Sequence, residues 1–305
     1  MLSIIVLIRN TRPSALKCLQ SLAQTLQKLA LSKNTELILI DDASDAQHGI
    51  PLMLREFRQN TGLGARLIHF TQRQHYTRGL AAAFSVAGGD QILFISHDMI
   101  VTPAYVQTLL AVSALDCSIG LVRGVSNYVD CFPQHVIAPP LSLRSFEDVI
   151  SFSDYVAHAQ GLTYVPDSLL TGDSMLIARS VLDKIGVFDP RYYGYFGDVD
   201  FGLRLQRAGF QMVCAKGAWL LHEGAGYYAD EARNTNQEMQ QVHARRMDIV
   251  QAAYALFRQK WDPAMPPQYS GVDAIDFARL RDMPPLVGGE YQPPIPVAPP
   301  LAEFL

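Results

Sequence analysis

The sequence lacks a long apolar run, a basic cluster and paired cysteines. Its apolar start, Ser3–Ile8, is far shorter than the roughly 20 residues of a membrane-spanning helix and lacks the flanks of a signal peptide. A net charge of −4 without a basic run disfavours nucleic acid as a main partner. The four cysteines are widely spaced, which fits buried thiols in a reducing compartment better than a disulfide framework or a zinc site. We therefore expect a cytoplasmic protein, with peripheral contact at the inner face of the membrane left open.

Three common catalytic motifs are also missing. There is no G-x-x-x-x-G-K-[ST] loop and no G-x-G-x-x-G turn after the first apolar run, which argues against P-loop and classical dinucleotide chemistry. No G-x-S-x-G elbow supports a serine hydrolase.

The first 124 residues alternate between short apolar β-branched runs and helical patterns. This alternation predicts right-handed βαβ units and an α/β fold with a mainly parallel sheet flanked by helices. Strands are expected at Leu2–Ile8, Glu36–Ile40, Ala65–Phe70 and Gln91–Ile95, and helices at Pro13–Ala30, Pro51–Arg58 and Gly79–Ala87.

The pattern then loosens and resumes. Tyr128–Leu170, with several prolines, is expected to be a long insertion of limited regular structure. Order returns at Gly172–Ala178 and in a helix at Arg179–Ile185, and a strand pair is expected at Gln211–Ala215 and Ala218–Leu221.

The last part of the chain combines a helix with a proline-rich tail. Arg233–Trp261 has the spacing of an amphipathic helix whose apolar face docks on the core, a membrane or partner surface being the alternative. Ten of the 18 prolines follow Asp262, which predicts an extended or weakly ordered tail.

Polar residues follow the predicted strands, where open parallel sheets bind ligands. Arg9 follows the first strand. Asp41 and Asp42 end the second, where they could accept from a nucleotide base or a ribose, or could serve a turn. Asp98 follows the fourth strand and could hold a magnesium-type ion, which needs only one or two protein carboxylates. His97 could be a second ligand, although an ordinary hydrogen bond is the commoner use of such a histidine.

A second group of polar residues lies between Phe196 and His222. Asp198 and Asp200 fall at the start of a predicted helix, where N-capping explains at least one of them. The apolar spacing of this helix directs Arg204 towards solvent. His222 follows at a predicted strand end, a common place for a metal ligand. An acid and an imidazole together indicate metal-assisted group transfer.

Taken together, these segments resemble family-2 glycosyltransferases of the GT-A fold over roughly residues 2–225. The opening SIIVLIRNTRPSALKCLQSL resembles the family's first strand and helix, and ELILIDDASD its strand ending in two aspartates. YTRGLAAAFSVAGGDQILFISHDM resembles the segment leading to the DxD motif. The strongest match is LLTGDSMLIARSVLDKIGVFDPRYYGYFGDVDFGLRLQRAGF.

The resemblance implies a role for each matching residue. Asp42 would contact the nucleotide base, with Arg9 and Asp41 beside it. Asp98 would hold the metal that bridges the donor diphosphate, and His222 would complete the metal site.

On the acceptor side, Asp198 would be the base, while Asp200 would serve as a helix cap. Asp173 falls at the donor–acceptor boundary, where it could touch a sugar hydroxyl or cap a turn.

The chain departs from the family pattern in three places. Ser96 stands where the DxD motif has its first acid, and Gly197 where the family has a glutamate before the base. Thr77 and Ser85 replace the asparagines that precede the DxD motif.

These observations predict an inverting, metal-dependent glycosyltransferase. It would use Mn²⁺ or Mg²⁺ and a nucleotide-sugar donor, UDP- or dTDP-linked, with a glycan, lipid-linked or protein hydroxyl as acceptor in polysaccharide biosynthesis. Residues 1–230 would form the GT-A domain, with a nucleotide-binding half (1–124) and an acceptor half (125–230), and residues 231–305 an extension that could serve a homo-oligomer. Ser96 and Gly197 favour the alternative, a weak or inactive GT-A domain acting as a binding or scaffold subunit. A sugar nucleotidyltransferase ranks below both because no glycine-rich loop follows the first strand.

Overall fold

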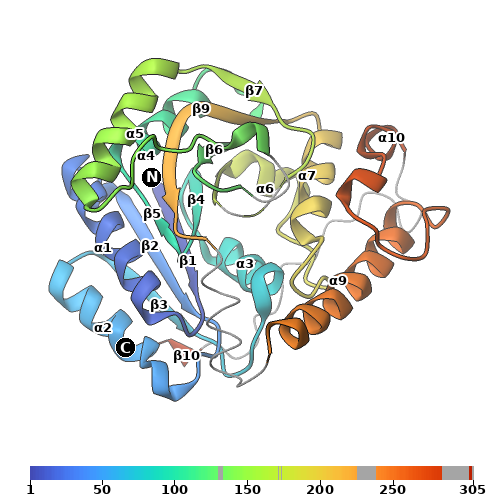
Figure 1. The fold of residues 1–305 in the computed structure, drawn as a ribbon, viewed down its shortest axis with the longest axis horizontal. Coiled ribbons are helices and arrows are strands. Elements are labelled where there is room, and N and C mark those ends of the chain that lie inside the picture. The colour runs from blue at the N-terminus through green and yellow to red at the C-terminus, as the bar shows by residue number, and fades with distance from the viewer. Residues whose placement is uncertain (130–132, 171, 173, 225–237, 284–301, 304–305) are drawn as a thin grey trace.

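The computed structural model describes residues 1–129, 133–170, 172, 174–224, 238–283 and 302–303. Helices flank a curled sheet whose strand order is β10-β3-β2-β1-β4-β8-β6-β9-β5, with β7 pairing to β9 (Figure 1). This is the α/β fold that the sequence predicts.

The first half of the chain forms the parallel part of the sheet. Its strands are β1 (Leu2–Ile8), β2 (Thr35–Asp41), β3 (Ala65–His69) and β4 (Gln91–Ser96). They pair in the parallel order β3-β2-β1-β4. The connecting helices are α1 (Arg12–Lys28), α2 (Ile50–Thr61) and α3 (His75–Val86). Ile4, Ile5 and Val6 of β1 are all fully buried, as expected of a parallel strand covered on both faces.

The second half adds strands of both directions. Strand β8 (Ser174–Ala178) lies antiparallel between β4 and β6 (Ile119–Ser126). Strand β9 (Gln211–His222) runs parallel to β6, and β5 (Met99–Ile100) and β7 (Tyr164–Pro166) pair antiparallel to β9. Because β4, β6 and β9 point the same way, their carboxyl ends face the same edge of the sheet as those of β1 and β2.

The expected strand pair at Gln211–Ala215 and Ala218–Leu221 is wrong, because both halves belong to the single strand β9. Opposite β6 the register jumps from Arg123↔Cys214 to Val125↔Trp219. The extra residues form an irregularity in β9 rather than a turn. A lysine and a glycine at Lys216–Gly217 look like a break in the sequence, but pairing on both sides holds the strand together.

The expectation of little regular structure in Tyr128–Leu170 is also wrong in part. This region contains α5 (Phe146–Gln160), which begins with a capping box in which the Ser145 hydroxyl and the Asp148 carboxylate each accept from the other's backbone N–H. Its buried positions, Val149, Ser153 and Val156, have the spacing of one helix face. The prolines before Ser145 hide this signal.

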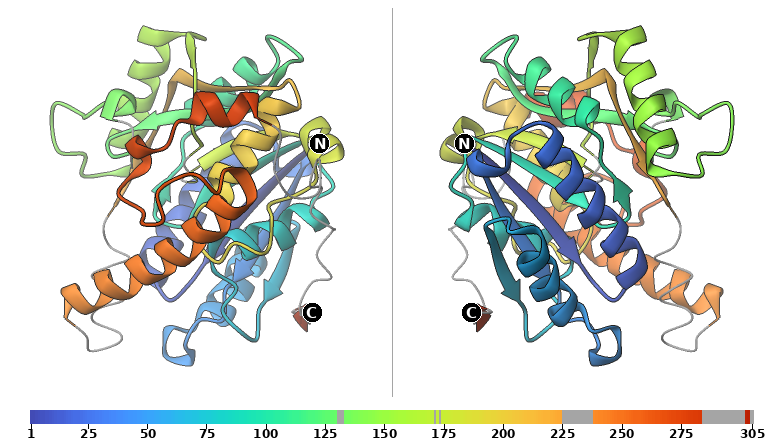
Figure 2. Two further views of the ribbon diagram at one scale, coloured as in Figure 1. Left: turned by 90° about the vertical axis from the view of Figure 1, so that its right-hand side faces the viewer. Right: turned by 90° about the vertical axis from the view of Figure 1, so that its left-hand side faces the viewer.

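The remaining helices are α4 (Pro103–Ser113), α6 (Arg179–Ile185), α7 (Gly197–Arg207), α9 (Met239–Trp261) and α10 (Phe277–Asp282), with 3-10 turns at Ser32–Asn34, Ala46–His48, Pro133–His135 and Val272–Ala274. Ala302–Glu303 form β10, antiparallel to β3. Figure 2 shows the sheet and its helices from two further sides. In the described part of the chain, no helix has the length and apolar character that spanning a bilayer requires.

Helix α9 packs against the loop that precedes α7 and against α7 itself. A hydrophobic cluster joins Phe257 and Trp261 of α9 to Tyr192, Phe196 and Leu203. Burial of each such side chain stabilises the fold by roughly 1.5–3 kcal/mol, so this contact fixes the end of α9 to α7 and the loop before it. The sequence-predicted start of the helix at Arg233 lies outside the described residues, as does the side chain of Met239.

Candidate active site

The carboxyl edge of the sheet carries unusual backbone geometry. Among the described residues, five that are not glycine have positive φ, and four of them are Asn10 after β1, Ala43 after β2, His75 at the start of α3, and Phe196 before α7. Such conformations are strained and tend to cluster at functional sites. The candidate donor and base residues lie directly beside these positions.

Asp41 is turned into the protein. Its Oδ1 accepts from the Ser44 N–H at 3.0 Å, and its Oδ2 lies 2.7 Å from His69 Nδ1. The side chain is fully buried. This geometry favours the turn interpretation, in which Asp41 supports the loop that carries Asp42.

Asp42 lies over the start of α3. Its two carboxylate oxygens accept from the backbone N–H groups of Gln74 at 2.5 Å and His75 at 3.0 Å. Burial raises the pKa of Asp42, and these hydrogen bonds together with the charge of Arg9 oppose that rise. Arg9 itself donates from Nη1 to the carbonyl oxygens of Asp42, at 2.8 Å, and Ala43, at 2.5 Å. Arg9 therefore fixes the loop after β2.

Asp98 and His222 meet at the candidate metal site. Their residues come from the ends of β4 and β9, and His222 Nε2 lies 3.2 Å from Asp98 Oδ2. The Met99↔His222 pairing of β5 with β9 sets this approach. His222 Nδ1 lies 3.2 Å from the carbonyl oxygen of Tyr128, which directs Nε2 towards Asp98. Metal-binding histidines use their second nitrogen in the same way, so this pair fits a divalent cation.

The environment keeps Asp98 ionised. Burial would raise the pKa of this carboxyl, but the hydrogen bond from His222 and the charges of His97 and His222 outweigh it and lower the pKa below its usual value. An ionised carboxylate is the form that binds a cation. His97 Nδ1 lies 3.1 Å from the Leu7 carbonyl oxygen, which favours the hydrogen-bonding role over the metal-ligand role for this histidine.

Asp198 lies in the first turn of α7 and is partly exposed. The left-handed residue Phe196 turns the chain sharply into this helix, and Asp198 Oδ1 accepts from the Val199 N–H at 2.9 Å. Gly197 packs against Thr77 of α3, so closely that a Cβ at position 197 would overlap the threonine side chain. Two of the positions where the chain departs from the family's pattern, Gly197 and Thr77, are therefore in contact with each other.

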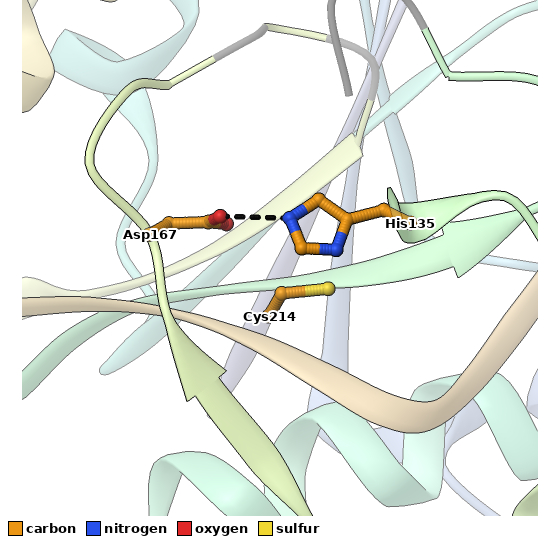
Figure 3. A group of neighbouring side chains, drawn as sticks. All are labelled: His135, Asp167 and Cys214. Atoms are coloured by element: carbon orange, nitrogen blue, oxygen red, sulfur yellow. Dashed lines mark hydrogen bonds and ion pairs between the residues drawn. The ribbon is translucent and has the colours of Figure 1, made fainter. Parts of the chain in front are cut away.

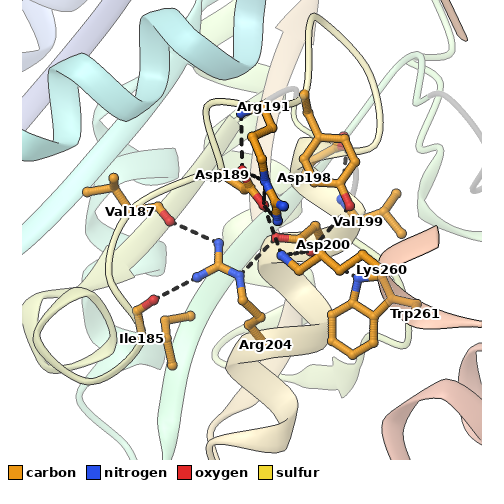
Figure 4. Close-up of polar contacts among 11 residues, drawn as sticks. Ile185, Val187, Asp189, Arg191, Asp198, Val199, Asp200, Arg204, Lys260 and Trp261 are labelled. Carbon is orange, nitrogen blue, oxygen red and sulfur yellow. Dashed lines mark hydrogen bonds and ion pairs between the residues drawn. The ribbon is translucent and has the colours of Figure 1, made fainter. Parts of the chain in front are cut away.

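Asp200 is not a helix cap. Its side chain is fully buried, its Oδ2 lies 2.9 Å from Arg204 Nε, and its Oδ1 lies 2.5 Å from Lys260 Nζ and accepts from Trp261 Nε1 at 3.0 Å (Figure 4). Lys260 also contacts Asp189 Oδ2 at 3.0 Å. We call Asp189, Asp200, Arg204 and Lys260 the buried ion network.

The placement of Arg204 towards solvent is also wrong. The arginine is buried and donates to the carbonyl oxygens of Ile185, at 2.7 Å, and Val187, at 2.9 Å. Lys260 was missed, since a lysine on an amphipathic helix is ordinarily exposed. The sequence signal was its position beside Trp261 on the apolar face.

Asp173, the remaining donor candidate, lies outside the described residues. Its neighbour Gly172 is described, and a Cβ there would overlap the Tyr76 side chain. The Tyr76 ring therefore lies against the segment that the sequence assigns to the donor–acceptor boundary.

A second cluster of possible ligand atoms lies away from this edge, where His135, Asp167 and Cys214 are all buried (Figure 3). Asp167 Oδ1 lies 2.9 Å from His135 Nε2, and its Oδ2 lies 2.9 Å from Arg123 Nε. Lys216 Nζ lies 3.1 Å from His135 Nδ1. Burial raises the pKa of Cys214 to about 11, which disfavours the thiolate. With two cations in place already, the cluster fits an ion-paired support for β9 better than a metal site.

Comparisons with known proteins identify the family and the fold. The family model of glycosyl transferase family 2 matches residues 3–186. An N-acetylglucosaminyl-diphospho-decaprenol L-rhamnosyltransferase of Mycobacterium tuberculosis is 42% identical over 60 residues, a match that spans 20% of this chain and 20% of that protein.

Solved structures share the fold at low sequence identity. A mannosyltransferase from Pyrobaculum calidifontis, in complex with GDP-Man and Mn²⁺, has a TM-score of 0.55 and 17% identity, over 81% of this chain and 64% of that chain. GalNAc-T7 with UDP, GalNAc and Mn²⁺ has a TM-score of 0.59 and 12% identity, over 92% of this chain and 54% of that chain. The family match covers more than half of the sequence, and the chain therefore belongs to glycosyl transferase family 2, with the GT-A fold of a glycosyltransferase.

Proposed function

We propose that the protein is an inverting, metal-dependent glycosyltransferase that moves a sugar from a nucleoside diphosphate to a hydroxyl of a saccharide or lipid-linked acceptor. One observation carries the proposal. Asp98 and His222, far apart in sequence, approach to 3.2 Å at the sheet edge that also carries Asp42. A metal-ligand pair beside a nucleotide-binding edge is the arrangement that activation of a diphosphate leaving group requires.

The donor half would bind the nucleotide. Asp42 would accept from the base with the lone pairs that its two backbone hydrogen bonds leave, and Arg9 and Asp41 would hold its loop in place. Asp173 would approach the donor sugar from the boundary segment. We propose UDP or dTDP as the donor nucleotide; the presence of UDP in the similar GalNAc-T7 structure supports the first.

The metal would be held by Asp98 and His222. A divalent ion bound there would stabilise negative charge on the leaving diphosphate as a Lewis acid. We propose Mn²⁺ or Mg²⁺, and the Mn²⁺ in two of the similar structures supports manganese.

Asp198 would take the proton of the attacking hydroxyl. An alcohol is a poor nucleophile at neutral pH, so a carboxylate must accept its proton as attack proceeds. Asp198 is partly exposed, whereas its neighbour Asp200 is fully engaged by Arg204 and Lys260. A single base acting opposite the leaving group inverts the anomeric configuration in one displacement.

A radiolabelled transfer assay tests the proposal, with UDP- and dTDP-linked sugars, saccharide and lipid-linked acceptors, and added Mn²⁺. We expect transfer with inversion in the wild type, loss with EDTA, and a fall of at least 100-fold in Asp198→Asn with donor binding retained. Asp200→Asn is a poor control because it disrupts the buried ion network. Asp154→Asn serves instead, since Asp154 is an exposed residue of α5. Full activity of a folded Asp198→Asn protein would refute the assignment of the base.

A weak or inactive GT-A domain that binds sugar nucleotides for a partner is the second candidate. The contact between Gly197 and Thr77 favours it, because the threonine occupies the space of the missing acid's side chain. Donor hydrolysis in the presence of Mn²⁺ separates the two candidates. Donor binding without hydrolysis or transfer would support the scaffold function.

The regions of the chain would divide the work. We propose that residues 1–124 bind the donor and that residues 125–230 carry the base and line the acceptor site. Residues 231–305 would form an extension that could contact a second copy in a homo-oligomer. We also propose that the protein acts in the cytoplasm, at the inner face of a membrane, in polysaccharide biosynthesis. The lipid-diphosphate acceptor in the name of the mycobacterial relative supports this location.

A further inference from the structure

A basic and aromatic surface surrounds the start of α3. The His75 ring lies 4.2 Å from the ring of Tyr193, measured between centroids. The Arg78 guanidinium carbon lies 5.1 Å from the centre of the same tyrosine ring. Arg78 is exposed, and its Nε donates to the Pro190 carbonyl oxygen at 2.9 Å, so the loop before α7 holds the guanidinium in place.

Helix α9 lies beside α3 and contributes further basic side chains to this surface (Figure 1). A Cβ at Gly194 would lie 3.2 Å from His75 Nδ1 and 3.7 Å from Ile249 Cγ2, so α9 and the start of α3 meet over this glycine. Arg245 is exposed, one turn before Ile249 on the same face of α9. The Arg246 guanidinium carbon lies 5.2 Å from the centre of the Tyr195 ring.

The positive charges of this surface act together on His75. Burial, and then the charges of Arg73, Arg9, Arg245 and Arg78, lower the pKa of His75 to about 3. The nearby Asp42 carboxylate, in the loop after β2, accepts hydrogen bonds from the backbone N–H groups of Gln74 and His75. Several arginines therefore converge where the imidazole stays neutral, which is an environment suited to a multiply charged anion.

We propose that Arg73, Arg78, Arg245 and Arg246 bind the phosphate groups of an anionic acceptor, a saccharide joined to a lipid through a diphosphate. The rings of Tyr193 and Tyr195 would hold the guanidinium groups of Arg78 and Arg246 in place. This proposal rests on the proposed transferase function and names the acceptor class of the same site. The donor diphosphate has its own candidate position at Asp98 and His222. The loop that carries the two tyrosines continues directly into α7 and Asp198, so a group bound on this surface lies on the acceptor side.

Calorimetric titration with farnesyl diphosphate tests the proposal on the full chain, with saturating UDP and Mn²⁺ present to occupy the donor site. Farnesol, inorganic pyrophosphate and phosphatidylglycerol vesicles are the comparison probes. We expect farnesyl diphosphate to bind more tightly than farnesol, with an affinity that falls as salt rises. The double variant Arg78→Gln/Arg245→Gln should weaken this binding at least tenfold, and Arg78→Lys/Arg245→Lys should retain most of it.

The matched control is Arg144→Gln. Arg144 is an exposed arginine just before α5, and both figures of the whole fold place α5 at the opposite end of the molecule from α9. Its loss should leave binding unchanged. Equal weakening in the control, unchanged binding in the double variant, or binding to vesicles without binding to farnesyl diphosphate would each overturn the proposal. A loss of UDP affinity in the double variant would also overturn it, by assigning the arginines to the donor.

Donor hydrolysis distinguishes this failure from failure of the transferase function. A wild-type protein that hydrolyses a nucleotide sugar but does not bind farnesyl diphosphate refutes the acceptor surface and leaves the function standing. A protein that binds the diphosphate through these arginines but neither hydrolyses nor transfers supports the surface and refutes the function.

Discussion

Replacement of Lys260 by methionine tests whether the buried ion network holds α9 against α7. The lysine side chain is only 3% exposed and lies between two fully buried carboxylates, 3.0 Å from Asp189 and 2.5 Å from Asp200. Methionine keeps most of the apolar length but removes the charge, and thus leaves a surplus of buried negative charge. Breaking a buried pair in this way costs about 3–5 kcal/mol.

Two features reduce the expected loss within that range. Asp200 keeps Arg204 at 2.9 Å, and Asp189 keeps Arg191 at 2.7 Å. We therefore expect a fall in the free energy of unfolding of about 3 kcal/mol, the lower end of the range for a broken buried pair. Urea titration at pH 7, followed by circular dichroism, measures it.

The pH dependence gives a second, independent readout. Burial would raise the pKa of Asp189, but its hydrogen bonds from Arg191 and the charge of Lys260 outweigh burial and lower it. A group whose pKa is lowered in the folded state stabilises the fold above its unfolded pKa of about 3.9, and this contribution is lost as the pH falls through the folded pKa. The difference between wild type and Lys260→Met should therefore shrink below about pH 4.

The control is Gln259→Met, because Gln259 is the exposed neighbour of Lys260 on α9. We expect its stability to change by less than about 0.5 kcal/mol. Adding Asp189→Asn to Lys260→Met should recover part of the loss, since it removes one of the two negative charges that lose Lys260. A Lys260→Met protein as stable as the wild type at pH 7, or a difference independent of pH down to 3, would refute the reasoning.

Three further changes test other contacts. Gly197→Ala should destabilise the protein by about 1–3 kcal/mol in urea titration, because the new Cβ overlaps the Thr77 side chain. Adding Thr77→Ala should restore most of that loss. A double variant as unstable as Gly197→Ala would contradict the contact. Ser145→Ala removes the cap of α5 and should lower the free energy of unfolding by about 1 kcal/mol; a change near zero would show that the box does not stabilise the helix. In thermal-shift assays Mn²⁺ should raise the melting temperature of the wild type but not of Asp98→Ala, and an equal rise in both would rule out this carboxylate as a ligand.

The sequence predicted the parallel part of the sheet almost residue by residue. The strand at Leu2–Ile8 and the helix at Arg179–Ile185 have the expected bounds. These elements consist of residues that are neighbours in sequence, so their apolar period is visible without the fold. The errors at β9 and α5 have one cause: glycine, lysine and proline suggested breaks that strand pairing and a capping box overcame.

The residues of the candidate site also divide into those that the sequence could predict and those that it could not. Asp42 and Asp98 could be proposed from the sequence because each ends an apolar strand, and the edge on which parallel strands end is a general property of the fold. The buried role of Asp200 could not, since three of its four partners come from a loop and from α9.

The sequence by itself therefore determined the alternation of strands and helices, the family resemblance and the set of acids at strand ends. Only the tertiary structure decided which side chains meet: Asp98 with His222, Gly197 with Thr77, and Lys260 with two aspartates. The physical reason is separation along the chain. Local patterning follows from residues a few positions apart, whereas each of these contacts depends on the register of β5 with β9 or on how helices pack over the sheet.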